Sequence, residues 1–303
     1  MAELNLQIRP LFQLDELDQV VELQHTYWGN DEEAVIPAHM LFSIAHHGGH
    51  VLTAFDNEKA VGVLVGFLGT SMEDSRRPAM ANLQIVSKRM VVLLEYRGQG
   101  IGYRLKRAQR ELAIKQGIRL VEWTFDPLLS LNAQLNVRKL GVTCPTYLED
   151  YYGTKERGGL TTLGTSDRLL AEWWVTNRRV EERLFGARAD LTLGQYLEAE
   201  TPVLNPTTRS SDGVVMPAAD DTVPVTLTKT LALLEIPHNF SDIVQRNPAL
   251  AVRWREHTRM TFKRMFTLGY IVTDFLHEKY DGRDRCFYVL SYQGPQFETV
   301  NLN

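Results

Sequence analysis

The sequence contains very little cysteine: Cys144 and Cys286 lie far apart and outside any CxxC or closely spaced Cys/His pattern. This scarcity argues against a disulfide framework and a zinc site of clustered ligands, and it favours a reducing, cytoplasmic setting. The chain also lacks an uninterrupted run of about 18 apolar residues. Its acidic N-terminal segment lacks the basic patch and apolar run of a signal peptide. We therefore expect no secretion and no membrane partner.

An excess of positive charge is also missing. Lys and Arg number 33 against 37 Asp and Glu, which gives a formal net charge of -4. Because nucleic-acid binding normally depends on a basic surface, we expect no nucleic-acid partner, and any anion site must be local. With 44% hydrophobic and 23% charged residues, the composition is that of a globular protein long enough for two domains.

Strand and helix patterns alternate over the first 175 residues, which predicts an α/β fold. The expected order is a strand at 5–12, helices from 15 and over 37–47, a hairpin HVLTAF/AVGVLVGFLG, a long strand LQIVSKRMVVLL, a helix from 101 to 117, a strand IRLVEWTF, a helix over 130–140 and a strand RLLAEWWV. The pattern then becomes irregular at 201–221, which indicates a linker. Beyond it we expect strands before 236, one helix over 241–268 and a final hairpin at Asp281-Gly282.

The most informative segment is the glycine-rich turn that follows the long strand, Glu95-Tyr96-Arg97-Gly98-Gln99-Gly100-Ile101-Gly102. A glycine turn at a helix N-terminus presents unpaired backbone N–H groups, which bind phosphate or pyrophosphate. The segment contains no Gly-Lys-Ser/Thr, which excludes a Walker loop. It also fails the G-x-G-x-x-G dinucleotide pattern, because Tyr103 or Leu105 occupies the third glycine position. We attribute further positive charge to Arg104, Lys106, Arg107 and Arg110 on the following helix.

The turn does fit Q/R-x-x-G-x-G/A through Arg97, Gly100 and Gly102. With the order of elements over residues 5–175, it resembles the GNAT superfamily of acyl-CoA N-acyltransferases. The segment WTFDPLLSLNAQLNVRKLG, with Tyr-Tyr-Gly at 151–153, is similar to a bacterial subgroup of predicted acetyl- and succinyltransferases. Some members of that subgroup are associated with N-acylamino acid racemase pathways.

The resemblance implies a GNAT-type mixed central sheet flanked by helices over residues 1–180. The residue pattern indicates a connecting helix and linker over 181–221 and a C-terminal α+β extension over 222–303. The resemblance also implies acetyl-CoA or another acyl-CoA, such as succinyl-CoA, as co-substrate, and we expect no metal. The residues that would hold the acyl-CoA are Met90, Val91 and Val92 beside the pantetheine arm, Arg97, Gly98, Gln99, Gly100, Ile101 and Gly102 at the pyrophosphate, and Asn132 and Asn136 on the opposite side.

The usual catalytic pair of the family is absent, because Val137 and Val86 stand where many members carry a tyrosine acid and a glutamate base. An amine must lose a proton to attack a thioester, and the leaving thiolate gains one. We predict Asp126, Glu122 and Tyr152 as the catalytic residues, with Asp126 favoured as the base because it ends a strand. Further candidates are His50, Tyr147 and Tyr151. An ordinary turn-capping role for Asp126 stays open.

Other charged groups are given ordinary roles. The cluster His46, His47 and His50 has no acidic or cysteine ligand nearby, so we predict no metal site. The arginines of the 241–268 helix are assigned to a solvated face or an ion-pair row between subunits, and the extension could close the acceptor site or form a homodimer contact. We expect direct transfer of an acyl group to a small primary amine or amino acid. The alternatives are a protein N-acetyltransferase and an acyl-CoA-binding module without catalysis.

Overall fold

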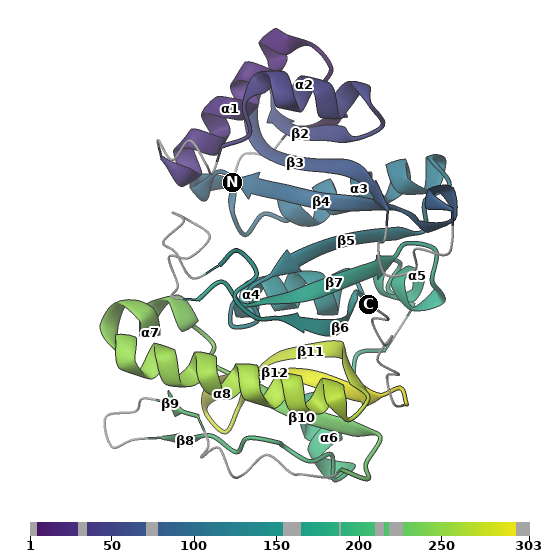
Figure 1. Cartoon of the computed structure of the whole chain (residues 1–303). Coiled ribbons are helices and arrows are strands. Elements are labelled where there is room, and N and C mark those ends of the chain that lie inside the picture. The colour runs from purple at the N-terminus through teal and green to yellow at the C-terminus, as the bar shows by residue number, and fades with distance from the viewer. Residues whose placement is uncertain are drawn as a thin grey trace. The chain divides into compact units, whose positions relative to one another are not determined.

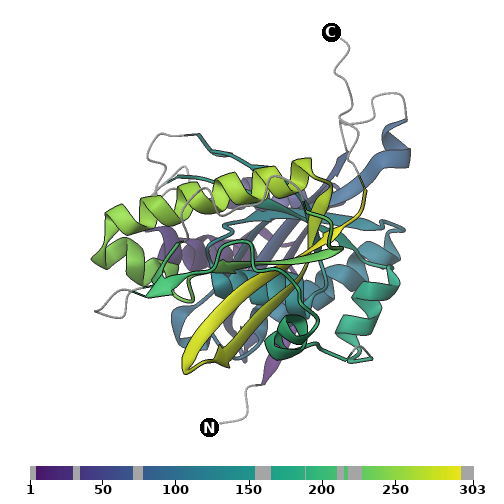
Figure 2. The same cartoon turned by 90° about the horizontal axis from the view of Figure 1, so that it is seen from below.

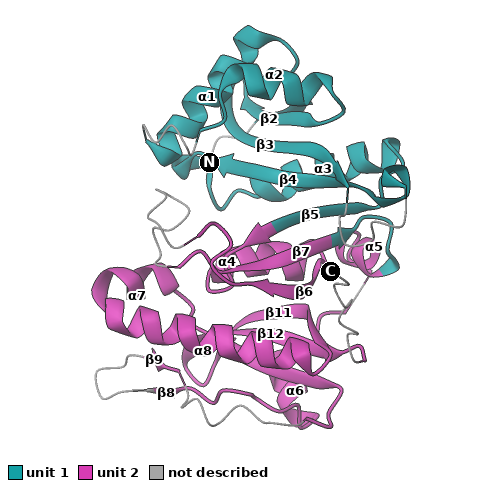
Figure 3. Cartoon of the chain, in the orientation of Figure 1, with its two compact units in different colours: residues 1–123, 155–162, 173–178 teal, residues 124–154, 163–172, 179–303 magenta. Residues whose placement is uncertain are grey.

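Helices and strands alternate along the chain in the order that the hydrophobic pattern predicts (Figure 1). The structure is a computed structural model, and it describes residues 5–29, 35–70, 78–153, 165–187, 189–209, 215–217 and 227–294. The chain forms two compact units (Figure 3). Unit 1 comprises Met1–Trp123, Lys155–Thr162 and Trp173–Arg178, and unit 2 comprises Thr124–Thr154, Leu163–Glu172 and Arg179–Asn303. These limits differ from the boundaries at 180 and 221 expected from the sequence, and that three-part division stays a prediction.

Unit 1 is built on a mixed sheet with the strand order β1-β2-β3-β4-β5, in which only the pair β4–β5 is parallel. Its elements are β1 (Leu6–Pro10), α1 (Leu14–Trp28), α2 (Ala38–His46), β2 (His50–Asp56), β3 (Lys59–Thr70), β4 (Leu83–Val92), α3 (Ile101–Lys115) and the first part of β5 (Leu120–Phe125). This arrangement confirms the predicted mixed sheet flanked by helices.

The central strands of unit 1 are buried on both faces, which explains their nearly continuous apolar sequences. Along β3, Val63 and Val65 point to one face and Gly62 and Gly66 to the other. A Cβ atom at Gly62 would lie 3.1 Å from the side chain of Ile101, so the glycine face is the one that α3 covers. At Gly66 a Cβ atom would lie 2.5 Å from the His50 ring, and this glycine therefore makes room for a polar cluster described below.

Strand β4 contains a bulge at Lys88, because Val65 pairs with Arg89 while the next residue, Gly66, pairs with Ser87. A bulge adds one unpaired residue and bends the strand. The bulge thus divides β4 into a first half and a C-terminal half that leads into the glycine turn.

Unit 2 contains strands in the order β7-β6-β11-β12-β10, covered by one long helix. Its elements are α4 (Ser130–Ala133) with a π-helical turn (Gln134–Lys139), β6 (Thr143–Leu148), most of β7 (Arg168–Trp174), α5 (Arg178–Leu184), α6 (Leu193–Glu198), β8 (Thr208–Arg209), β9 (Val215–Met216), β10 (Leu231–Ile236), α7 (Phe240–Arg246), α8 (Pro248–Thr267), β11 (Tyr270–Tyr280) and β12 (Arg283–Tyr292). Helix α8 packs along β6 and β11, as Figures 1 and 2 both show. Phe262 of α8 contacts the rings of Tyr147 and Tyr288 there.

One expectation needs correction. The helix predicted over 241–268 is two helices, because Pro248 lacks the N–H that would continue α7, and the Asn247 side chain caps α8 instead. Strand β6 and helix α6 were not predicted. The linker expected at 201–221 lies partly outside the described residues. The final hairpin is confirmed, with Asp281 and Gly282 at positive φ in its turn.

Among the helices in the described residues, none has the length and apolar character needed to cross a membrane.

Candidate functional site

The predicted phosphate loop joins β4 to α3 in unit 1. After a short 3₁₀ turn at Leu94–Tyr96, Gly98 and Gly100 adopt φ values of 77° and 78°, and α3 begins at Ile101. These left-handed conformations favour glycine. A Cβ atom at either glycine would meet nothing within 4 Å, so the space beside the loop is open. The first N–H groups of α3 have no partner within the helix, and they carry the positive end of its dipole. The loop therefore has the geometry of an anion site.

The side chains at this loop carry less free positive charge than the sequence suggested. Arg97 is exposed, but its Nε donates to the Val92 carbonyl oxygen at 3.2 Å and its guanidinium lies over the Tyr27 ring. Arg110 donates to the Val175 carbonyl oxygen at 2.7 Å, and Lys106 is buried. Arg104 and Arg107 stay exposed. Lys106 and Arg110 are thus engaged within the protein, and the positive charge expected from these two residues at the loop is corrected.

The C-terminal half of β4 contains the predicted pantetheine contacts. Met90, Val91 and Val92 pair with Leu64, Val63 and Gly62 of β3. On its other side β4 pairs with β5 in parallel at Ile85–Val121 and Val86–Glu122. Within unit 1 no residue of β4 after Val86 pairs with β5. The edge of β4 beyond Val86 thus has no β5 partner in unit 1.

A buried polar cluster lies between α3 and the sheet of unit 1, and we call it the Lys106 cluster: Lys106, Ser87, Gln109 and His50. Lys106 Nζ donates to Ser87 Oγ at 2.9 Å and to Gln109 Oε1 at 3.2 Å. Because Gln109 Oε1 accepts this bond, the Gln109 amide nitrogen donates to His50 Nε2, 2.8 Å away. The neutral His50 ring therefore carries its proton on Nδ1.

The cluster shifts two pKa values. Burial, aided by the charge of Lys106, lowers the pKa of His50 from 6.5 to about 4. Burial likewise lowers the pKa of Lys106 well below its ordinary value. Lys106 Nζ also lies 3.3 Å from the centroid of the Trp123 ring, a cation–π contact. His50 is therefore neutral at physiological pH, and the two groups form a titratable pair in the core of unit 1.

Asp126, the predicted base, lies in unit 2 and is buried in an ion pair. Arg255 of α8 donates to both carboxylate oxygens, at 2.8 and 2.7 Å, and the Leu128 N–H donates to Oδ1 at 2.9 Å. Arg168 Nη1 lies 3.9 Å from Oδ2. Both carboxylate oxygens already accept hydrogen bonds within the protein, which leaves them poorly placed to take a proton from an amine. These contacts favour a structural role for Asp126, and the base role stays a prediction.

Tyr152, another predicted catalytic residue, lies near Arg168, which also lies near Asp126. The guanidinium of Arg168 lies 5.3 Å from the centroid of the Tyr152 ring, and burial lowers the pKa of this arginine. The Tyr152 backbone N–H donates to Ser166 Oγ at 2.9 Å. The structure therefore places both Asp126 and Tyr152 near Arg168, a residue that the sequence analysis did not select.

A second ion-pair centre in unit 2 surrounds Asp167. Arg259 donates to both of its carboxylate oxygens, at 2.9 and 2.7 Å, and the Tyr147 hydroxyl donates to Oδ2 at 2.6 Å. Burial alone would raise the pKa of Asp167, but these hydrogen bonds outweigh it and leave the pKa lowered. Arg255 and Arg259 thus make internal ion pairs, which corrects their assignment to a solvated or intersubunit face of the helix.

The remaining predicted residues are placed as follows. Glu122 lies on β5 in unit 1, partly buried, at the last position that pairs with β4. Asn136 is buried in the π-helical turn, whereas Asn132 is exposed on α4. π-helical turns occur often at functional sites. The Arg168, Arg255 and Lys106 contacts were missed because their partners are distant in sequence, and no local spacing announces them.

Part of the chain, mainly its first half, is similar to a known protein family. Residues 14–141 match the model of the acetyltransferase (GNAT) family. No curated protein matches the chain. Among solved structures, NAA60 of Arabidopsis thaliana in complex with acetyl-CoA is 13% identical, with 56% of this chain and 99% of that chain covered at a TM-score of 0.45.

Two further solved structures are similar. The ribosomal-protein-S18-alanine N-acetyltransferase of Escherichia coli is 13% identical, with 57% of this chain and 95% of that chain covered at a TM-score of 0.43. An aminoglycoside acetyltransferase from an uncultured soil metagenomic sample is 18% identical, with 41% of this chain and 82% of that chain covered at a TM-score of 0.35.

Proposed function

Because residues 14–141 are a GNAT acetyltransferase domain, we propose that this chain transfers an acetyl group from acetyl-CoA to a small primary amine or amino acid. The observation that carries the proposal is the loop at 97–102. Two glycines at positive φ leave open space beside a helix N-terminus, which suits the pyrophosphate of CoA. Succinyl-CoA is the second donor to test, because the sequence resembles transferases of both acyl groups.

The reaction is a direct transfer within a ternary complex. The amine nitrogen attacks the thioester carbonyl carbon, the carbon–sulfur bond breaks, and the thiolate takes up a proton while the amine loses one. In this proposal the backbone of Met90–Val92 forms hydrogen bonds with the pantetheine amides, and one of its N–H groups polarises the thioester carbonyl. The β4 edge beyond Val86, which lacks a β5 partner in unit 1, supports that assignment.

For the proton transfers we propose Glu122 as base and Tyr152 as acid. Asp126 is poorly suited to the base role, because Arg255 holds both of its carboxylate oxygens. Glu122 is partly buried at the point where β4 and β5 cease to pair in unit 1. A carboxylate acts as a base only when it is ionised, so its activity should fall as pH drops through its pKa.

The test uses the purified chain in two steps. Acetyl-CoA, succinyl-CoA and free CoA are compared for their effect on the melting temperature, since a specific ligand raises apparent stability by mass action. Thiol release is then followed with amino acids, polyamines and peptides bearing a free N-terminus. Thiol release with small amines supports the proposal, whereas release only with peptides indicates a protein N-acetyltransferase. Stabilisation without release on any amine indicates a binding module, and no stabilisation contradicts acyl-CoA binding.

A further inference from the structure

Two histidines and a cysteine from different parts of the sequence lie together at three neighbouring strands of unit 2. His238 follows β10, His277 lies on β11 and Cys286 lies on β12. In the strand register, Cys286 is directly opposite His277 on one side and Ile236 on the other. Residues directly opposite in an antiparallel pair project to the same face of the sheet. The hairpin therefore places the Cys286 thiol and the His277 imidazole side by side.

The ligand atoms of these residues all lie within 4.8 Å of one another. Cys286 Sγ is 3.9 Å from His238 Nδ1, and the two imidazole centroids are 4.6 Å apart. With Zn–S bonds of about 2.3 Å and Zn–N bonds of about 2.0 Å, two ligand atoms of a tetrahedral zinc ion lie about 3.5 Å apart. The observed spacing thus needs only small ring rotations to match such a site.

The surroundings hold the three side chains in place. Cys286 is fully buried, and Ser130 Oγ donates to the His238 backbone carbonyl at 2.7 Å, which fixes the segment after β10. The opposite face of the hairpin packs on an apolar cluster that includes Leu276 and Phe287. His277 and Cys286 therefore project from two paired strands and His238 from the turn after β10, with His238 exposed and Cys286 buried.

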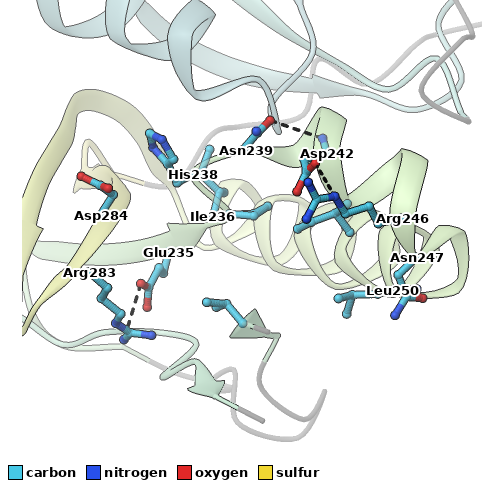
Figure 4. A pocket seen from close by; sticks show the side chains of 13 residues that line it. Glu235, Ile236, His238, Asn239, Asp242, Arg246, Asn247, Leu250, Arg283 and Asp284 are labelled. Atoms are coloured by element: carbon cyan, nitrogen blue, oxygen red, sulfur yellow. Dashed lines mark hydrogen bonds and ion pairs between the residues drawn. The ribbon is translucent and has the colours of Figure 1, made fainter. Parts of the chain in front are cut away.

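A cavity of about 340 Å³ in unit 2 adjoins the cluster, and His238 and Asp284 lie near each other at one end of it (Figure 4). Asp284 lies two residues before Cys286 on β12 and therefore on the same face. Its negative charge acts on both His277 and Cys286. A cation at the cluster would have a carboxylate nearby and an opening on one side.

We propose that His238, His277 and Cys286 form a binding site for a transition-metal ion of the zinc class, with its fourth position open to this cavity. Thiolate and imidazole are the ligands that select such ions over magnesium or calcium. The site is separate from the acyl-CoA loop, and its existence does not depend on the proposed function. It differs from the expectation of no metal, which considered only cysteines and histidines close together in sequence.

Binding at this site involves loss of the thiol proton: Cys–SH and M²⁺ give Cys–S–M⁺ and H⁺. Metal binding should therefore release about one proton per ion, and the apparent affinity should increase with pH.

The test uses Co²⁺ as a spectroscopic probe and Zn²⁺ as its competitor, on the full chain. We expect one Co²⁺ per chain, with tetrahedral d–d absorption and a thiolate-to-cobalt charge-transfer band that Zn²⁺ abolishes. The band should disappear in Cys286→Ser and persist in Cys144→Ser, the matched control, because Cys144 is equally buried but outside the cluster. His238→Ala and His277→Ala should each weaken binding at least tenfold, whereas His47→Ala, an exposed histidine of unit 1, should not.

A second measurement follows proton release. Zn²⁺ should release about one proton per ion in weakly buffered solution at pH 8, and Cys286→Ser should abolish this release. The proposal is overturned if the native chain gives no thiolate band, if the band survives Cys286→Ser, or if Zn²⁺ releases no proton from the native chain.

Discussion

Arg255 donates hydrogen bonds of 2.8 and 2.7 Å to the two carboxylate oxygens of Asp126, a residue 129 positions earlier in the chain. Both side chains are almost fully buried. Asp126 lies within the predicted acyltransferase domain 1–180 and Arg255 within the predicted extension 222–303, yet both belong to unit 2. The C-terminal helix α8 is therefore part of the structure that holds the end of β5, and we do not expect the chain to fold with residues 222–303 removed.

The first prediction concerns this ion pair. Asp126→Ala leaves the Arg255 charge buried without its main partner and should lower the free energy of unfolding by about 3–5 kcal/mol. Arg255→Met should destabilise the chain to a similar extent, and the double variant Asp126→Leu/Arg255→Met should recover most of the loss. Urea unfolding measures all three. Additive losses in the double variant would contradict the structural role.

Activity separates the two roles of Asp126. Asp126→Asn retains hydrogen-bond acceptance but cannot act as a base. We expect it to keep most of kcat, whereas Glu122→Gln should lower kcat about 100-fold or more, the usual contribution of a general base. A large loss in Asp126→Asn together with full activity in Glu122→Gln would restore Asp126 as the base.

The second prediction concerns the phosphate loop and has a control at the other end of the same helix. Gly100 and Gly117 flank α3, both have positive φ, of 78° and 72°, and neither has an atom within 4 Å of an added Cβ. Alanine at either position should cost about 1 kcal/mol of stability through backbone strain. Only Gly100→Ala should raise the KM for acetyl-CoA, by about tenfold, since Gly100 lies in the loop that we propose to bind the pyrophosphate of CoA. Equal KM values in both variants would exclude the loop as the CoA site.

The third prediction is a pH dependence of stability that arises from His50. The pKa of His50 is about 4 in the folded chain against 6.5 unperturbed, so below pH 6.5 the unfolded chain binds a proton that the folded chain does not. Stability should therefore fall as pH decreases from 6.5 to 4, by about 3 kcal/mol for this group at 1.36 kcal/mol per pKa unit. His50→Gln, which still accepts the Gln109 bond, should flatten that part of the curve. His47→Gln is the control, because His47 is exposed, and an unchanged slope in His50→Gln would contradict the assignment.

The sequence predicts the elements whose apolar residues follow a regular period. The hairpin of β2 and β3, the strand β4 with its glycine turn, and helix α3 are all present as expected. Strand β6 was missed because its sequence, TCPTYL, contains a proline and shows no alternation. The break between α7 and α8 was missed although Pro248 marks it, since the apolar pattern continues on both sides.

The polar core was the part least accessible to sequence analysis. Charged residues on a helix are usually solvated, so nothing in the pattern of α8 distinguishes Arg255, which pairs with Asp126, from an exposed arginine. The cluster of His238, His277 and Cys286 was inaccessible to sequence analysis for the same reason, because only the register of β11 with β12 places Cys286 opposite His277. Such pairings are decided by the tertiary fold, and the local sequence does not encode them.

The last prediction concerns the buried lysine of unit 1. Lys106 is almost fully buried, and its hydrogen bonds to Ser87 and Gln109 supply no negative charge to offset the cost of burying an ammonium group. Because burial lowers its pKa, the unfolded chain holds the Lys106 proton more tightly than the folded chain does. The stability of the native chain should therefore rise with pH up to the ordinary lysine pKa, through this group.

Lys106→Met removes the titrating group and keeps the length of the side chain. The difference in unfolding free energy between Lys106→Met and the native chain should shift in favour of the native chain as pH rises from 7 toward the ordinary lysine pKa, because burial lowers the pKa of Lys106. The constant loss of the Ser87 and Gln109 hydrogen bonds displaces the two curves without changing this trend. Lys115→Met, at an exposed position of α3, should show no such shift. Parallel curves for Lys106→Met and the native chain would show that the lysine keeps its ordinary protonation in the core.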